Sequence, residues 1–335
     1  MSAVQELWYK KSLVAWLLWP LSVLFCLISG VRRSLFRAGI KTSSKPDAFI
    51  IVVGNITVGG NGKTPVVLAV VEHFKTQGVL VGVLSRGYGG TMTAHPHLVS
   101  PNDDASVVGD EPSLIARRAG VPVVIDPIRA RGAAKLADEL GCKVIVCDDG
   151  LQHYALKRDL ELVVMDKRLL GNGHLLPMGP LREKPNRLAS ADALILNGDV
   201  DLTALNQTVN LPQDFGFTLI GNGFVNVRNH ELKRVSTDFT GKRVSALAGI
   251  GHPQRFFKQL SDMGVDTARC RAFADHHHFQ PEDLPDGTVL MTEKDAVKVR
   301  EFAHEDCWYL PVKASFPTTF YAFLHRHYVN YSKEK

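Results

Sequence analysis

Short apolar runs alternate with amphipathic stretches from residue 48 to residue 196, in the order typical of β-α-β units. The apolar runs are nearly uninterrupted, which indicates a parallel sheet with helices over both faces. We expect nucleotide-binding and catalytic groups to gather at the carboxyl ends of its strands. The predicted strands cover residues 48–54, 79–84, 121–125, 143–147, 160–165 and 193–196, and the predicted helices cover residues 65–76, 111–118 and 127–140.

The pattern changes at residue 215. Two extended runs flank Asn222-Gly223, a dipeptide favoured in tight turns, and this predicts a β-hairpin. A second, smaller α/β unit follows, with strands expected at 244–249, 289–292 and 308–312 and a helix at 253–263. We therefore divide the chain into an N-terminal helical segment (1–42), a first α/β domain (43–214), a hairpin linker (215–236) and a C-terminal α/β domain (237–335).

A glycine-rich loop follows the first predicted strand and ends in Gly62-Lys63-Thr64, directly before a predicted helix. Small residues let backbone N–H groups surround a phosphate chain, and the helix points its positive end at the same place. Lys63 is expected to reach the β- and γ-phosphates of ATP, and the Thr64 hydroxyl to contact Mg²⁺. Thr57 stands where the usual P-loop pattern has its first glycine. The predicted phosphate-binding residues are Thr57, Val58, Gly59, Gly60, Asn61, Gly62, Lys63 and Thr64.

A second acidic element supports this interpretation. The apolar run 143–147 leads into Asp148-Asp149-Gly150, where P-loop proteins place an Asp that holds Mg²⁺. Adjacent side chains of a strand point to opposite faces, so both carboxylates serve one ligand only if the strand ends there, as Gly150 suggests. The alternative is an exposed acidic loop. We infer a site for ATP and Mg²⁺.

The residues from 12 to 30 include no charged side chain and approach the roughly 20 residues that cross a bilayer. Positive charges stand on both sides, at Lys10, Lys11, Arg32, Arg33 and Arg37, so neither flank is favoured for translocation. We expect a helix or bent helical hairpin in the cytoplasmic leaflet. A spanning helix and a buried helix of a soluble core are the alternatives. A cleaved signal peptide is set aside, because export would separate the site from ATP.

Composition narrows the remaining classes. The chain has 335 residues, 45% of them apolar and 22% charged, which is ordinary for a globular protein. The net charge of +5 comes without a long basic run or interleaved aromatic and basic residues, so no nucleic acid partner is expected. Five cysteines form no C-x-x-C pair and are expected to be reduced thiols. No protein partner is implied.

Further candidate groups lie outside the nucleotide loop. Asp110 precedes a predicted helix and serves either as a helix cap or as the base that accepts a proton from an attacking hydroxyl. The run of Asp275 and three histidines suggests a metal cluster, but consecutive side chains diverge, and one histidine beside a carboxylate is the more economical interpretation. Gln152 fits either a turn or a ligand-positioning role. Arginines in glycine- and proline-rich settings, Arg129 and Arg182 among them, are either solvated charges or phosphate ligands.

Taken together, these segments resemble the lipid A tetraacyldisaccharide 4′-kinase family. The resemblance spans nearly the whole chain, and the T-x-G-G-x-G-K-T form of the loop is the form that this family has. Its motifs are GNITVGGNGKTPVV (54–67), SRGYGG (85–90), GDEP (109–112), DDGLQHY (148–154), GPLRE (179–183), AGIGHPQRFF (248–257), ADHH (274–277) and MTEKDAVK (291–298).

The resemblance implies an inner-membrane kinase, peripheral or monotopic on the cytoplasmic face. It would transfer the γ-phosphate of ATP to the 4′-hydroxyl of an acylated glucosamine disaccharide 1-phosphate, forming the 1,4′-bisphosphate lipid A precursor. It makes Asp110 a base paired with His276. The implied metal-handling residues are Thr64, Asp148, Asp149 and Glu111; the supporting residues are Lys63 and Arg182 for catalysis, Gln152 for the nucleotide, and Arg129 and Arg182 for the substrate.

The expected fold class is therefore α/β, with a P-loop NTPase-like parallel sheet covered by helices. A second smaller α/β domain, a β-hairpin linker and an N-terminal membrane-associated helix complete it. Two other functions stay open on the residues alone. One is a membrane-bound P-loop ATPase or GTPase switch that has no lipid acceptor, and the other is a non-catalytic scaffold. Asp110 argues against the switch, and the intact Lys63, Thr64 and Asp148 argue against the scaffold.

Overall fold

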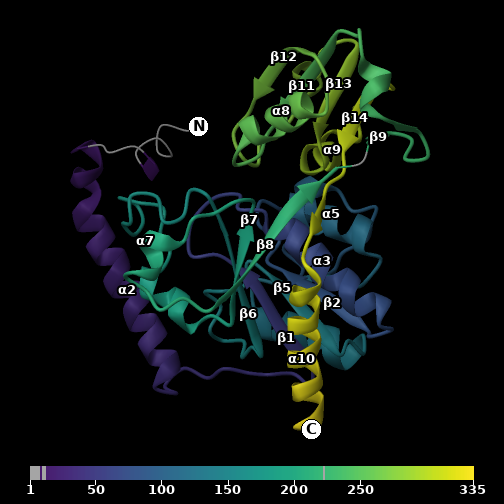
Figure 1. Ribbon diagram of the computed structural model, residues 1–335. Coiled ribbons are helices and arrows are strands. Elements are labelled where there is room, and N and C mark those ends of the chain that lie inside the picture. The colour runs from purple at the N-terminus through teal and green to yellow at the C-terminus, as the bar shows by residue number, and fades with distance from the viewer. Residues whose placement is uncertain (1–7, 10–12, 222) are drawn as a thin grey trace.

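The computed structural model describes residues 8–9, 13–221 and 223–335. Within them the chain forms two sheets, one of nine strands and one of six, and the smaller sheet lies above the larger one in Figure 1. Helices cover both faces of the larger sheet. The expected α/β class is confirmed, and so is the long apolar helix near the N-terminus.

The larger sheet is built around β1 (Phe49–Gly54), which pairs in parallel with β5 (Val144–Asp148) and β6 (Leu160–Asp166). Every residue of these three strands is buried, and this explains why β1 and β5 appear in the sequence as nearly continuous apolar runs; β6 also contains the buried Glu161. The parallel neighbours further out are β2 (Val81–Ser85), β4 (Val123–Ile125), β7 (Ala193–Asn197) and β8 (Gln213–Ile220), and the antiparallel edges are β3 (His97–Leu98) and β15 (Lys313–Ser315).

The alternating side chains of β1 supply two cores. Phe49, Ile51 and Val53 pack in one core with the helices α3 (Lys63–Thr76), α5 (Asp110–Ala119) and α10 (Thr318–Lys333). Ile50 and Val52 face the opposite core. That core is covered by α6 (Arg129–Ala134) with its π-helical continuation (Lys135–Glu139), by a 3-10 helix (Pro185–Ser190) and by α7 (Thr203–Asn206). Both faces of β1 are thus removed from water, as the continuous pattern requires.

The smaller sheet repeats this arrangement. Its strands β11 (Val244–Ala248), β12 (Thr267–Ala272), β13 (Thr288–Thr292) and β14 (Cys307–Leu310) are parallel, and β9 (Phe224–Asn226) and β10 (Lys233–Arg234) extend it antiparallel. The helix α8 (Pro253–Asp262) packs Phe256 and Leu260 into one core, and α9 (Glu293–Val299) packs Ala296 and Val299 into the other.

The expected hairpin across Asn222-Gly223 is wrong, and Asn222 itself lies outside the described residues. Strand β8 pairs with β7 and β15 of the larger sheet, whereas β9 pairs with β14 and β10 of the smaller sheet. The apolar residues of the two runs belong to different cores: Phe215 packs on Phe320 of α10, and Phe224 packs on Phe239. A turn-favouring dipeptide can therefore also mark a crossing between two sheets.

The end of the chain returns to the larger sheet. Strand β15 pairs antiparallel with β8, and α10 packs its buried Phe320, Phe323 and Leu324 into the core that contains β1. We expected residues 313–335 in the second unit. The structure places them on the first, because the apolar side chains of α10 are buried in the core of the larger sheet. The boundaries at residues 42, 214 and 236 stay predictions.

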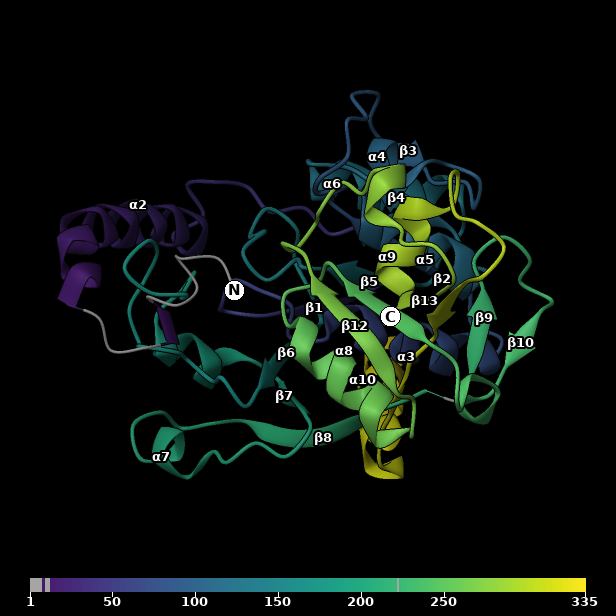
Figure 2. The ribbon, with the colours of Figure 1, turned by 90° about the horizontal axis from the view of Figure 1, so that it is seen from above.

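A 3-10 helix (Leu13–Leu18) leads into the long helix α2 (Trp19–Arg37), with Pro20 in its first turn. The segment Val14–Arg37 has 24 residues and contains an 18-residue window with a mean hydropathy of 2.1, which suffices by length and composition to cross a membrane. Only 11% of that window is buried, so the alternative of a helix inside a soluble core is wrong. Figures 1 and 2 both show α2 running along one side of the larger sheet.

Truncation of Phe320 to alanine should destabilise the larger sheet, because this side chain is fully buried and its ring lies 5.4 Å from that of Phe215 and 4.1 Å from that of Phe316. A cavity of that size costs about 3–5 kcal/mol of unfolding free energy. Urea unfolding measures the loss, with Thr319→Ala on the exposed side of α10 as the control. Equal stability of both variants would show that α10 is dispensable for the core.

Candidate active site

The nucleotide loop joins the carboxyl end of β1 to the start of α3. Gly59 and Gly62 have φ angles of +116° and +91°, which side chains other than hydrogen rarely tolerate. A Cβ at Gly62 would also lie 2.4 Å from Nδ2 of Asn197. Lys63 is the first residue of α3 and is only 9% exposed, and Thr64 follows it. The glycines are therefore needed both for the backbone turn and for the close approach of Asn197.

Thr57 has a structural role that explains why it replaces a glycine. Its hydroxyl accepts hydrogen bonds from the Asn61 amide at 2.9 Å and from the Asn55 amide at 3.4 Å. The neighbouring Val58 N–H donates to Pro180 O at 2.8 Å, and Ile56 O accepts from the N–H of Arg182 at 2.7 Å. The loop is thus closed on itself and tied to the segment that contains Arg182.

The two aspartates after β5 do meet at one site, because the strand ends where we expected. Asp148 is its last residue and pairs with Val53 of β1, and Asp149 has a left-handed φ of +48° that turns the chain away. Asp149 lies 3.6 Å from the Lys63 ammonium and 2.8 Å from the Arg182 guanidinium. Burial alone would raise the pKa of Asp149, but Lys63 and Arg182 outweigh it and lower the pKa to about 2.

The surroundings of Asp148 shift its pKa in the opposite direction from that of Asp149. It is 1% exposed, and neither carboxylate oxygen has a hydrogen-bond partner among the residues that the structure describes. Burial, followed by the nearby charge of Glu111, raises the pKa of Asp148 to about 7. A buried carboxylate without a partner is costly, so the site favours a cation at this position.

The arginines and Gln152 are arranged around these aspartates. Gln152 donates to Asn55 O at 3.1 Å and to Glu183 at 2.9 Å, and so it braces the loop. Arg182 bonds to both oxygens of Asp149. Arg129, by contrast, is 3% exposed and donates to the backbone carbonyl of Asp148 at 2.8 Å. The side chain therefore supports the end of β5, while its Nε and Nη1 have no hydrogen-bond partner among the described residues, and the expected substrate contact stays a prediction.

Asp110 and His276 come together from different units. Asp110 opens α5, whose N-cap is Gly109 without a side-chain cap bond, so the helix-cap alternative receives no support. His276 Nδ1 lies 3.1 Å from Asp110 Oδ2, and Lys298 Nζ lies 3.9 Å from the same oxygen. Burial would raise the pKa of Asp110, but the hydrogen bond from His276 and the charges of Lys298 and Lys294 lower it. Asp110 is therefore ionised at neutral pH.

Lys294 of α9 is a site residue that the sequence reasoning missed. Its ammonium lies 3.2 Å from Glu111 Oε1, 3.4 Å from His276 Nε2 and 3.6 Å from Asp275 Oδ1. Burial would lower the pKa of Lys294, but the surrounding carboxylates raise it instead. Lys294 belongs to the segment MTEKDAVK, so the motif that carried the resemblance already contained the signal.

The other histidines of this run do not form a metal site. His277 bonds to Asp283 at 3.0 Å and stacks on Phe273, which holds it within its own loop. No group of three or more metal-binding side chains of the His, Cys, Asp and Glu types occurs in the part of the chain that the structure describes. A single histidine beside a carboxylate, as we preferred from the sequence, is what the geometry shows for His276.

Known proteins resemble this chain along nearly its full length. A sequence model of the tetraacyldisaccharide-1-P 4′-kinase family matches residues 14–328. The tetraacyldisaccharide 4′-kinase of Pseudoalteromonas atlantica is 49% identical over 302 residues, covering 90% of this chain and 96% of that protein. The protein of the same description from Haemophilus influenzae is 46% identical over 312 residues, covering 92% of this chain and 90% of that protein.

A solved structure of a protein with a similar fold agrees with these sequence matches. The crystal structure of LpxK from Aquifex aeolicus in complex with ATP superposes with a TM-score of 0.78 at 27% sequence identity, covering 94% of this chain and 100% of that one. The family match, the relatives and the shared fold all cover both sheets and the segments that form the site. The chain therefore belongs to the tetraacyldisaccharide-1-P 4′-kinase family, and it is an ATP-dependent lipid kinase.

Proposed function

We infer that the chain transfers the γ-phosphate of ATP to the 4′-hydroxyl of a tetraacyldisaccharide 1-phosphate, which yields the 1,4′-bisphosphate precursor of lipid A. The observation that carries this mechanism is the Asp110–His276 pair, which joins the two units beside the nucleotide loop. A nucleotide switch without an acceptor needs no ionised carboxylate in that position. A kinase does, because the attacking hydroxyl must lose its proton.

In this proposal, residues 57–64 hold the phosphates of ATP. The backbone N–H groups of the loop and the positive end of α3 face the anionic chain, and Lys63 supplies a charge within its reach. Asp149 positions the ammonium of Lys63 before the nucleotide arrives, and Arg182 holds the Asp149 carboxylate in place. Gln152 positions the loop through Asn55, and Arg182 also stabilises charge on the γ-phosphate as it is transferred.

Mg²⁺ fits the acidic side of the same site. The two unpartnered oxygens of Asp148 are suited to a divalent cation, and burial together with the nearby Glu111 charge, which raises the pKa of Asp148, makes a positive charge favourable there. The other expected ligands are Thr64, Asp149 and Glu111. Asp149 is paired with Lys63 and Arg182, and Glu111 with Lys294, so these carboxylates do not form a preassembled cluster with Asp148 among the described residues. When bound, Mg²⁺ supplies positive charge against the phosphates of ATP.

Asp110 acts as the base and His276 orients it. Lys294 donates to Nε2 of His276, so the ring proton lies on Nδ1 and is donated to Asp110. The remaining lone pairs of Asp110 accept the proton of the 4′-hydroxyl. The sugar oxygen then bonds to the γ-phosphorus while the bond from phosphorus to the β-γ bridging oxygen breaks, and ADP leaves.

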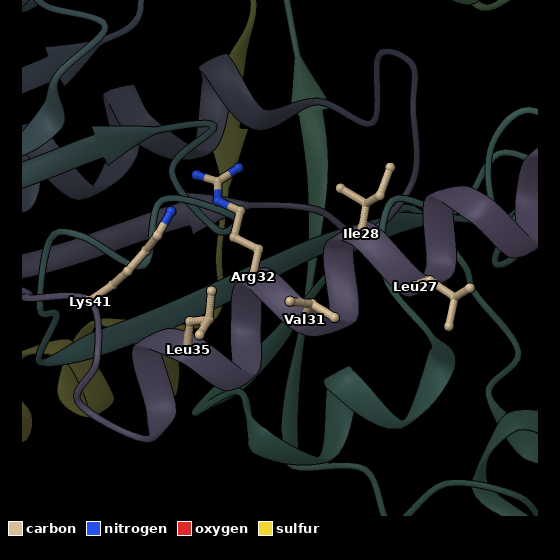
Figure 3. A pocket seen from close by; sticks show the side chains of 6 residues that line it. All are labelled: Leu27, Ile28, Val31, Arg32, Leu35 and Lys41. Atoms are coloured by element: carbon tan, nitrogen blue, oxygen red, sulfur yellow. The ribbon is translucent and has the colours of Figure 1, made fainter.

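The enzyme works at the cytoplasmic face of the bacterial inner membrane, with α2 lying in the surface of the bilayer. The outer side of α2 exposes apolar side chains, and Figure 3 shows a groove where Leu27, Ile28, Val31 and Leu35 lie beside the ends of Arg32 and Lys41. Such a face buries apolar area in lipid and attracts anionic headgroups.

Contacts along α2 support the in-plane orientation over a transmembrane one. Ser22 bonds to Leu175 O and to the N–H of Met178, each at 3.0 Å, Trp16 packs on His174, and Phe36 packs on Tyr154. These contacts run from near one end of the apolar segment to the other. A helix crossing the bilayer would therefore draw the non-helical backbone of residues 174–178 into the hydrocarbon.

Asp110→Asn should reduce kcat at least 100-fold while changing ATP affinity little, because a base acts in the transition state. Product formation from ATP, Mg²⁺ and a tetraacyldisaccharide 1-phosphate is followed by mass spectrometry of the lipid. His276→Ala should lower kcat as well, and the double variant should be little worse than Asp110→Asn alone, since the two residues act as one unit. Multiplicative losses, or no phosphorylated lipid from the wild type, would refute the mechanism.

Asp148→Asn should stabilise the nucleotide-free protein increasingly as the pH rises from about 4 to 7. In this interval the folded state, with its raised pKa, binds more protons than the unfolded chain, so the wild type loses unfolding free energy as pH increases. The variant lacks this loss. Urea unfolding at pH 4.5 and pH 8 without Mg²⁺ measures it, with Asp266→Asn at an exposed position as the control. A stability difference independent of pH would contradict the assignment.

The double variant Leu27→Glu with Val31→Glu should bind anionic vesicles at least tenfold more weakly, because each change removes apolar area from the lipid-facing side. These side chains are 60% and 59% exposed. Vesicle flotation measures the effect, and Leu232→Glu, 51% exposed on the second unit, is the matched control. ATP affinity should be unchanged. Undiminished vesicle binding would remove α2 from the membrane contact.

A further inference from the structure

The second unit touches the nucleotide loop itself. The turn between β11 and α8 places Gly251 against Gly60, so closely that a Cβ at Gly251 would lie 2.8 Å from the Gly60 nitrogen. Gly60 belongs to the phosphate-binding loop, whereas Gly251 precedes α8 of the smaller sheet. The conformation of the loop is therefore bounded by a backbone that belongs to the other unit.

A chain of side-chain hydrogen bonds runs from α8 into the same loop. Arg255 donates from Nη2 to Oδ1 of Asn197 at 2.5 Å. Asn197 donates from Nδ2 to the backbone oxygen of Asn61 at 3.0 Å, and Asn61 donates to the Thr57 hydroxyl at 2.9 Å. Asn197 is the last residue of β7 and is 4% exposed, so water does not substitute for its partners.

Arg255 decides which way the Asn197 amide faces. A guanidinium has donors only, so the amide must turn its oxygen toward Arg255 and its NH₂ toward the Asn61 carbonyl. Without Arg255 only the Asn61 carbonyl still favours this orientation, because the reversed amide would set its oxygen against the Asn61 carbonyl oxygen. The Asn197 amide also packs on Gly62, directly before Lys63. The orientation of the Asn197 amide therefore affects the loop at Asn61, through the hydrogen bond, and at Gly62, through packing.

Arg168 holds the loop from the first unit. It donates to Gly60 O at 2.9 Å and to the Asn61 side-chain oxygen at 2.6 Å, and Asp166 pairs with it at 2.7 Å. These bonds fix the Asn61 side chain but leave its backbone carbonyl to Asn197. Arg255 is therefore the side chain through which the second unit influences the loop.

We propose that Arg255 is a positioning residue that sets the ATP-binding conformation of the nucleotide loop through the Asn197 amide. The proposal rests on the phosphate-binding function proposed above for residues 57–64. Arg255 contacts neither the Asp110–His276 pair nor the acceptor in this mechanism. Its removal should therefore weaken nucleotide binding and leave the chemical step and the lipid affinity nearly unchanged.

Calorimetric titration with ATP and Mg²⁺, together with steady-state kinetics, tests this on the full chain. Arg255→Ala should raise both the Kd and the KM for ATP about tenfold, as expected for loss of a charge-assisted hydrogen bond from this exposed arginine to the buried amide of Asn197. Turnover at saturating ATP and the KM for the lipid should stay within about threefold. Arg255→Lys should restore part of the affinity, because a lysine still donates.

Asn197→Asp separates orientation from simple packing. The new side chain has nearly the same shape and still accepts from Arg255, but it cannot donate to the Asn61 carbonyl. It should weaken ATP binding at least as much as Arg255→Ala, and the double variant should be no worse than Asn197→Asp alone. Unaltered ATP binding by Asn197→Asp, or fully additive losses, would overturn the proposal.

Two further variants make the outcomes distinct. Arg269→Ala removes an exposed arginine from the same unit and should leave ATP affinity unchanged; a tenfold loss there would show that the effect of Arg255 is not specific. Lys63→Ala tests the underlying assignment. If Lys63→Ala binds ATP normally, the nucleotide loop itself is misassigned. If Lys63→Ala fails to bind ATP while Arg255→Ala binds normally, only the role of Arg255 is refuted.

Discussion

The site depends on Lys63, whose ammonium is buried beside the start of a helix, where a positive charge is unfavourable. Lys63 is 9% exposed at the first turn of α3, at the positive end of the helix dipole, so its ammonium needs a nearby anion. Asp149 meets this need at 3.6 Å and is in turn paired with Arg182. The same requirement explains the left-handed backbone of Asp149, which directs this carboxylate to the lysine while Asp148 completes the strand. Lys63 and Arg182 together carry more positive charge than Asp149 neutralises, and the polyphosphate of ATP supplies further negative charge.

The two units are joined along α5. At its start, Asp110 meets His276 and Glu111 meets Lys294 of α9. At its end, Arg118 donates to Glu293 of α9 at 2.7 Å and to the carbonyl of Val312 at 2.8 Å, just where the chain returns to the larger sheet. Burial raises the pKa of Glu293 to about 7 in spite of Arg118. The packing of α5 on α9 thus helps to hold Asp110 at its distance from His276.

The segment from residue 174 to residue 183 links the membrane helix to the chemistry. One part of it holds Ser22 and packs on Trp16 of the N-terminal helical region, and a few residues later Arg182 reaches Asp149. Arg33 of α2 lies 3.8 Å from Glu183, which also accepts from Gln152. The exposed apolar helix is therefore connected to the nucleotide loop by a short path of hydrogen bonds. In the proposed function this path suits a substrate whose head reacts while its tails stay in the bilayer.

The sequence by itself determined the elements whose cause is local. Continuous apolar runs identified the buried strands, the glycines around Lys63 identified the loop, and the uncharged stretch after residue 12 identified the exposed helix. Asp148, Asp149, Asp110 and His276 were found because their residue types and motifs carry chemistry. The structure alone decided what depends on contacts between distant segments. It separated β8 from β9, returned α10 to the first sheet, buried Arg129 behind β5 and brought Lys294 and Arg255 to the site. These outcomes follow from complementary surfaces and charges far apart in the chain, and no short pattern encodes which distant partner a side chain will meet.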